Sequence, residues 1–216
     1  MTRMYAGGNY RWMRRTALAA GILGLLGGCN IFMPLFLMGQ HKERIPAEFD
    51  KLPGSSATIA VWADQETLFD YPYVRMELSL HIADQLSAHV KDLKITDGRI
   101  VEDYMQRHLA NAVDPVTLGR KFKTDYVIYL ELLDFQIRDP NSPDFLEPII
   151  RATVHVYDMK ADPDEPKMVE LSDVEVKQQG QLFNETSAQI ARKSLYEEFA
   201  ATVAQKFYEH KVEMMK

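Results

Sequence analysis

Apolar residues recur about every four positions in two parts of the chain, which predicts two amphipathic helices. The first stripe consists of Val74, Leu78, Ile82, Leu86 and Val90. The second consists of Ala188, Ala191, Leu195, Phe199, Val203 and Phe207. We expect Pro72 to open the first helix, because proline is well suited to the first turn. Thr186 and Gln189 have the spacing of a capping box, so we expect the closing helix to begin there.

Short runs of β-branched and aromatic residues predict five strands. Three of them are expected over residues 57–62, 93–95 and 126–137, and the start of the third is apolar at every position, as in a strand covered on both faces. Over 150–157, apolar and polar positions alternate, which is typical of an antiparallel strand with one open face. The apolar positions are Ile150, Ala152, Val154 and Val156, and the polar or amphipathic ones are Arg151, Thr153, His155 and Tyr157. A fifth strand is expected over 168–176.

Two further helices lie between the early strands. One is expected over residues 100–112, with Ile100, Tyr104, His108 and Leu109 near one face, and a short one from Pro115. The element order β-α-β-α-α-β-β-β-α predicts an α+β domain. Its mixed sheet has about five strands, with helices packed mainly on one face.

The first 28 residues have the organisation of an export signal. Four arginines precede an uncharged run from Thr16 to Leu25, and the small residues Gly27 and Gly28 then lead to Cys29. The run Leu26-Gly27-Gly28-Cys29 resembles the lipobox of bacterial lipoproteins. The resemblance implies cleavage before Cys29 and lipid attachment to its thiol. Residues 1–28 would then be a signal peptide.

Residues 29–56 would comprise the lipidated cysteine, an apolar segment and a polar tether that precedes a single domain over 57–216. A competing interpretation is an uncleaved signal anchor, because residues 16–39 form an uncharged stretch of 24 residues and about 20 span a bilayer. Both interpretations place residues 40–216 outside the cytoplasm. Asn30, rather than an aspartate, follows Cys29, which favours the periplasmic face of the outer membrane over the inner membrane.

Charge and composition narrow the function classes. Residues 1–28 contain four of the 25 basic residues and none of the 31 acids, so the remainder has a net charge of −10. Such a domain repels phosphates, and we expect no nucleic-acid partner. None of the six histidines is placed three or four positions from another on a predicted helix, so we expect no metal site and no cofactor.

No nucleophile or phosphate-binding motif is present. Glu131 lies inside the most apolar strand, so it is the one acid whose surroundings suggest a buried carboxyl group that could donate a proton. Pairing with a neighbouring arginine or lysine is the ordinary alternative.

The segment Leu118-Gly119-Arg120-Lys121-Phe122-Lys123-Thr124-Asp125-Tyr126-Val127-Ile128 resembles a helix-to-strand crossover of several envelope proteins. That group includes the amino-terminal domain of TolB, the curli-secretion lipoproteins and the lipoprotein activators of penicillin-binding proteins. The resemblance implies an α+β fold and a role in binding or scaffolding envelope proteins. Lys123-Thr124 stands where Gly-Ala is usual.

Large apolar side chains cluster in the loop before the first predicted helix, at Leu68, Phe69, Tyr71 and Tyr73. Exposed aromatic residues bind partners well. The alternative is that Phe69 and Tyr73 fold back over the sheet edge. We therefore predict a non-enzymatic, membrane-anchored lipoprotein that binds or scaffolds other envelope proteins and could form an oligomer. An accessory lipoprotein of an envelope transport system and, less favoured, an exported hydrolase are the alternatives.

Overall fold

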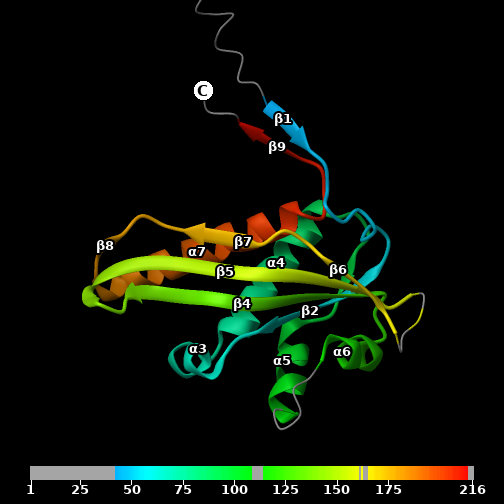
Figure 1. Cartoon of the computed structure of the whole chain (residues 1–216), viewed down its shortest axis with the longest axis horizontal. Coiled ribbons are helices and arrows are strands. Elements are labelled where there is room, and N and C mark those ends of the chain that lie inside the picture. Colours follow the sequence, from blue (N-terminus) through cyan, green and yellow to red (C-terminus); the bar gives the residue numbers. More distant parts are fainter. Residues whose placement is uncertain (1–41, 109–113, 161, 163–164, 214–216) are drawn as a thin grey trace, which may run out of the picture. The chain divides into compact units, whose positions relative to one another are not determined.

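A mixed β-sheet organises residues 44–210 in the computed structural model (Figure 1). The structure describes residues 42–108, 114–160, 162 and 165–213. Cys29 and the predicted signal segment lie outside the described residues. None of the described helices is both long enough and apolar enough to span a bilayer.

Seven strands form this sheet, in the order β3-β2-β4-β5-β6, with β7 and β8 also pairing with β5. β2 runs parallel to both β3 and β4, and the remaining pairs are antiparallel. The predicted mixed sheet is therefore confirmed. The strands are β2 (Ser56–Trp62), β3 (Lys94–Ile95), β4 (Tyr126–Asp139), β5 (Ser142–Asp158), β6 (Lys167–Glu170), β7 (Val174–Lys177) and β8 (Gln181–Leu182). A separate two-stranded sheet pairs β1 (Lys42–Ile45) with β9 (His210–Glu213).

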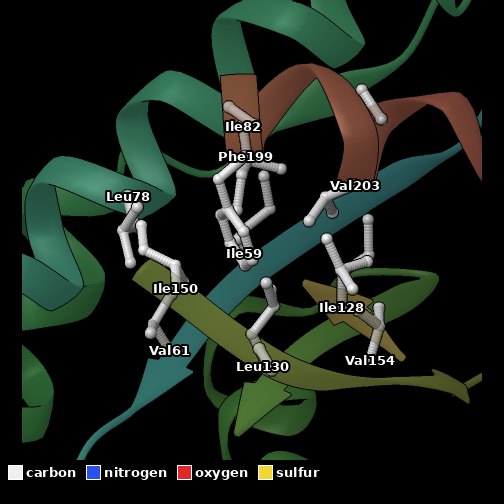
Figure 2. Packing of buried hydrophobic residues seen from close by; sticks show 14 of the residues in the cluster. Ile59, Val61, Leu78, Ile82, Ile128, Leu130, Ile150, Val154, Phe199 and Val203 are labelled. Carbon is white, nitrogen blue, oxygen red and sulfur yellow. The ribbon is translucent and has the colours of Figure 1, made fainter. Parts of the chain in front are cut away.

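Two long helices, α4 (Val74–His89) and α7 (Glu185–Gln205), cover one face of the sheet. Their predicted apolar stripes are confirmed, because every residue of both is buried except the partly buried Ala188. Figure 2 shows the stripes meeting the alternate, inward-facing residues of β2, β4 and β5. The labelled side chains are Ile59, Val61, Leu78, Ile82, Ile128, Leu130, Ile150, Val154, Phe199 and Val203. Burial of these side chains supplies the main stabilising term of the fold.

Two shorter helices, α5 (Gly98–Arg107) and α6 (Pro115–Phe122), pack on the second face over β2 and β4 (Figure 1). They enclose a smaller cluster around Ala60, Val101, Met105 and Leu118. The residues that the sequence pattern grouped on one face of the first of these helices do not form its buried side, since Ile100 is 57% exposed. The helix instead turns Val101 and Met105 inward. Residues 109–112 of its predicted span lie outside the described residues.

Two predicted helix starts were also wrong. Pro72 opens no helix, because it lies between α4 and a short helix, α3 (Gln65–Asp70), which the sequence pattern did not reveal. The closing helix begins two residues earlier than predicted. Its capping box is formed by Asn184 and Ser187. The side chain of Asn184 accepts a hydrogen bond from the Ser187 N–H, and the side chain of Ser187 accepts one from the Asn184 N–H.

The predicted fifth strand is interrupted between β6 and β7. Leu171 is buried there, and the exposed Ser172 turns toward the segment that precedes β2. That segment was predicted to be a free polar tether up to residue 56. This was wrong for its last part, because Phe49 and Leu52 are core residues.

A polar clamp holds this segment against the end of α7. The ammonium of Lys206 donates to Glu48 Oε1 at 3.0 Å, and the N–H of Ser172 donates to Glu48 Oε2 at 2.9 Å. The Ser172 hydroxyl donates to the same carboxylate at 2.5 Å. Burial alone would raise the pKa of Glu48, but these hydrogen bonds and the charge of Lys206 lower it below its usual value.

We predict that Glu48→Gln lowers the free energy of unfolding by about 1–2 kcal/mol at neutral pH, because charged hydrogen bonds are lost. A lowered native-state pKa means that the stabilisation is present above the unfolded-state pKa and is lost as the pH falls through the native-state value. The difference between variant and wild type should therefore shrink in acid. Urea unfolding at several pH values measures it, with the exposed Asp50→Asn as control. A difference that stays constant with pH would contradict the assignment.

Candidate functional site

The carboxyl end of β2 lies where the chain changes from one face of the sheet to the other. The connection after β2 leads through α3 to α4 on the first face, whereas the connection after the neighbouring β3 leads to α5 on the second. In open sheets with parallel strands, such a point leaves a crevice where ligands commonly bind. The structure has a hollow at this place.

The hollow has a volume of about 540 Å³ and receives residues from β2, α3, α4, α5, α6, β4 and β5. We call it the aromatic hollow. It is lined by Trp62, Ala63, Asp64, Gln65, Leu68, Arg75, Met105, Asp114, Pro115, Tyr129 and Tyr157.

Three aromatic side chains form a diagonal row on the second face of the sheet. Ala60 is in register with Tyr129, and Val127 is in register with Tyr157, so Trp62, Tyr129 and Tyr157 occupy diagonal positions on β2, β4 and β5. Trp62 is 39% exposed, and both tyrosines are partly buried. Ring surface is therefore accessible within the hollow.

Two aspartates that line the hollow are the N-caps of α3 and α6. Each of them bonds to a threonine three positions further along the chain. Asp64 accepts hydrogen bonds from the N–H and hydroxyl of Thr67, at 2.8 and 3.0 Å. Asp114 accepts the equivalent bonds from Thr117, at 2.9 and 2.7 Å. The bond from the Thr67 N–H is the main cause that lowers the pKa of Asp64. Burial alone would raise the pKa of Asp114, but its bonds from Thr117 lower it, so both carboxylates are ionised at neutral pH.

The tyrosines of the hollow experience these negative charges. The pKa of Tyr129 is raised to about 12, mainly by burial and in addition by the charge of Glu131. Burial likewise raises the pKa of Tyr157, with contributions from Asp114 and Glu131. The phenols therefore stay neutral over the physiological range, in a field that is negative on balance.

A buried ion pair links α4 to α5 at the hollow. Arg75 Nη2 lies 2.6 Å from Glu102 Oε1, and both side chains are less than one-tenth exposed. Gln106 donates a further hydrogen bond to the same carboxylate oxygen at 2.9 Å. Arg75 Nε is buried without a hydrogen-bond partner among the described residues. Arg75 lines the hollow, but the negative charge of Glu102 compensates its positive charge.

The four predicted contact residues divide into two pairs. Leu68 and Tyr71 face inward, because positions three apart lie on one face of a helix or its end, and Tyr71 packs edge-on against Phe135 with ring centroids 4.8 Å apart. Phe69 is 85% exposed and Tyr73 64%. The alternative that these two fold back over the sheet edge was wrong. Only Leu68 of the four lines the aromatic hollow.

A second hollow of about 430 Å³ lies on the other side of α3 and includes Asp64, Asp70, Tyr71, Asp134 and Arg138 among its lining residues. α3 therefore forms a wall between two hollows. Its exposed Phe69 belongs to the lining of neither.

Glu131 is half-buried, in register with Trp62 and Thr153. Its carboxylate has no hydrogen-bond or ion-pair partner among the residues that the structure describes, so the expected pairing with an arginine or lysine was wrong. It does not line either hollow. Within the same residues, no group of three or more His, Cys, Asp or Glu side chains has the geometry of a metal site.

Sequence reasoning missed the Arg75–Glu102 pair and the hollow itself. A signal was present, because Arg75 adjoins the buried stripe at Val74 and Glu102 adjoins Val101 on a second helix. The aromatic row could not be found in this way, since it depends on the register of three strands.

Removing one partner of the buried ion pair should lower the free energy of unfolding more than removing both. We predict that Glu102→Leu costs about 3–5 kcal/mol of unfolding free energy, because it leaves a buried, uncompensated guanidinium. The double variant Arg75→Met, Glu102→Leu should lose clearly less unfolding free energy than Glu102→Leu alone. Urea unfolding of Glu102→Leu, of Arg75→Met and of the double variant tests this. A double variant that loses the sum of the two single effects would refute compensation between the charges.

No family model and no curated protein matches the chain. Among solved structures, the PelC dodecamer from Paraburkholderia phytofirmans is 12% identical, with 77% of this chain and 96% of that chain covered and a TM-score of 0.43. The lipoprotein GNA1162 from Neisseria meningitidis is 13% identical over 68% of this chain and 98% of that chain, with a TM-score of 0.38. Uncharacterized lipoprotein B from Nitrosomonas europaea is 13% identical over 72% and 80%, with a TM-score of 0.33. Similarity of this degree does not establish a shared function.

Proposed function

We propose that the chain is an exported bacterial lipoprotein, anchored through Cys29, that binds other proteins of the cell envelope without catalysing a reaction. The anchor rests on the order of basic, apolar and small residues before Cys29. Two or more acyl chains hold a protein stably at a membrane. Asn30 favours the outer membrane as the site of the anchor.

The observation that carries the binding role is the exposure of Phe69 and Tyr73 beside the aromatic hollow. Large aromatic side chains on a surface supply much contact area at a low entropic cost. They are also common among the residues that dominate binding energy in interfaces. The inward-facing Leu68 and Tyr71 fix α3 to the core, so Phe69 is presented on a supported helix, and Tyr73 stands at the start of the buried helix α4.

We predict that Cys29 carries the lipid. Metabolic labelling with a fatty-acid analogue should mark the wild-type chain and leave Cys29→Ala unlabelled. Mass spectrometry of the purified protein should place the mature amino terminus at Cys29. A mature chain that retains Met1 would contradict cleavage and support the signal anchor.

We predict that Phe69 on α3 and Tyr73 at the start of α4 contact a partner protein. A photo-crosslinking amino acid at position 69 or 73, introduced in intact cells, should capture the same protein from both positions. The matched control is position 190 on α7, where Ile190 is also a large exposed apolar residue. Phe69→Ala should reduce recovery of the captured protein by co-purification. Adducts limited to lipid, abundant porins or a second copy of the chain would contradict the proposal.

A further inference from the structure

We propose that the aromatic hollow binds the cationic side chain of an arginine or lysine on a partner protein. This inference rests on the proposed function, because it specifies the chemistry of the partner. It depends on three properties of the hollow: its accessible ring faces, its negative charge and its position beside an exposed apolar pair.

The ring faces make the hollow suitable for a cation. Trp62, Tyr129 and Tyr157 stand in a diagonal row, and the ring of tryptophan is the most favourable partner for a cation among the aromatic side chains. Both tyrosines are neutral at physiological pH, so each offers a ring and a hydroxyl without a charge of its own. Guanidinium and ammonium groups bind such ring faces, and a partly desolvated site strengthens the attraction.

The charges around the rings favour the same ligand. Among the described residues that line the hollow, Asp64 and Asp114 are ionised carboxylates and none is a lysine. Arg75 is the one cation among these described lining residues, and Glu102 compensates its charge at 2.6 Å. Glu131 lies next to the row and adds a further negative charge. An anionic ligand would therefore be repelled, whereas a cation gains from both the rings and the carboxylates.

The surroundings favour a protein side chain over an isolated small cation. Phe69 is exposed on α3, the helix that supplies Gln65 and Leu68 to the lining, and Tyr73 is exposed at the start of α4. A partner segment could place its basic residue in the hollow and an apolar residue against Phe69. The net charge of −10 after residue 28 would also attract a basic partner over longer distances.

The hollow contains its own reporter. Trp12 and Trp62 are the two tryptophans of the chain, so Trp12→Phe leaves Trp62 as the single one, whether or not residues 1–28 are cleaved. The full chain in detergent would be titrated with N-acetylarginine methylamide and N-acetyllysine methylamide, and the fluorescence of Trp62 recorded. We expect a saturable change that weakens at high salt. N-acetylcitrulline methylamide, which has nearly the shape of the arginine probe without its charge, should give little change.

Matched variants test the residues. Asp64→Asn and Asp114→Asn remove one charge each while keeping a good helix cap, and each should weaken binding of the arginine probe by about threefold to tenfold. Asp97→Asn is the control, because Asp97 caps α5 and does not line the hollow. Tyr157→Leu should weaken binding, whereas Tyr157→Phe should retain it.

Three outcomes would overturn the inference: equal binding of the citrulline and arginine probes, unchanged affinity in the Asp64→Asn, Asp114→Asn double variant, or stronger saturation by acetate or by N-acetylglucosamine. The proposed function fails separately. If crosslinking at position 69 captures a partner but no cationic probe binds, only the cation inference fails. If the probes bind but crosslinking recovers no partner, the protein-binding role fails and the hollow is a site for small cations.

Discussion

Burial of β2 on both faces is the constraint on which the arrangement of this domain depends. Its inward residues Ile59 and Val61 pack under α4 and α7, and Ala60 on the other face packs under α5 and α6. A strand covered in this way requires helices on both sides, so successive connections must pass to opposite faces. The crevice at the end of β2 follows from that requirement.

Polar contacts fix β2 against the segment that enters its parallel neighbour β4. Ser56 donates from its N–H and hydroxyl to the carboxylate of Asp125, at 2.8 and 2.9 Å, and the hydroxyl of Thr58 bonds with that of Thr124 at 3.1 Å. The bond from the Ser56 N–H is the main cause that lowers the pKa of Asp125. Because register in a sheet determines which face a side chain occupies, these contacts also set the diagonal row of aromatic residues.

The junction between α6 and β4 places particular demands on Lys123 and Thr124. Lys123 has a φ of 54° at the end of α6, a left-handed conformation that glycine adopts more readily. Thr124 is buried and bonded to Thr58, so a hydroxyl has a role that an alanine could not fill. A Cβ atom at Gly119 would lie 2.8 Å from Met159 Sδ, so a larger residue there would displace the Met159 side chain.

The sequence was sufficient for elements whose pattern repeats over many residues. The stripes of α4 and α7 and the alternation in β5 were predicted, because burial on one face leaves a regular trace. Shorter features were not. α3 has six residues, too few for a period to appear, and its Asp64 cap was the only local signal. Glu102 was missed because its burial depends on Arg75 of another helix, which periodicity within one helix does not report.

α3 explains why the site was only half predictable. In a helix this short, Leu68 and Tyr71 can face the core only if Phe69 faces away from it, since adjacent positions lie about 100° apart. The cluster of four apolar residues therefore could not act as one surface. An ordinary amphipathic helix would carry polar side chains at the outward positions. The outward position of α3 instead holds Phe69, which is 85% exposed and gains little from burial within the described fold, and the proposed partner contact would use this ring.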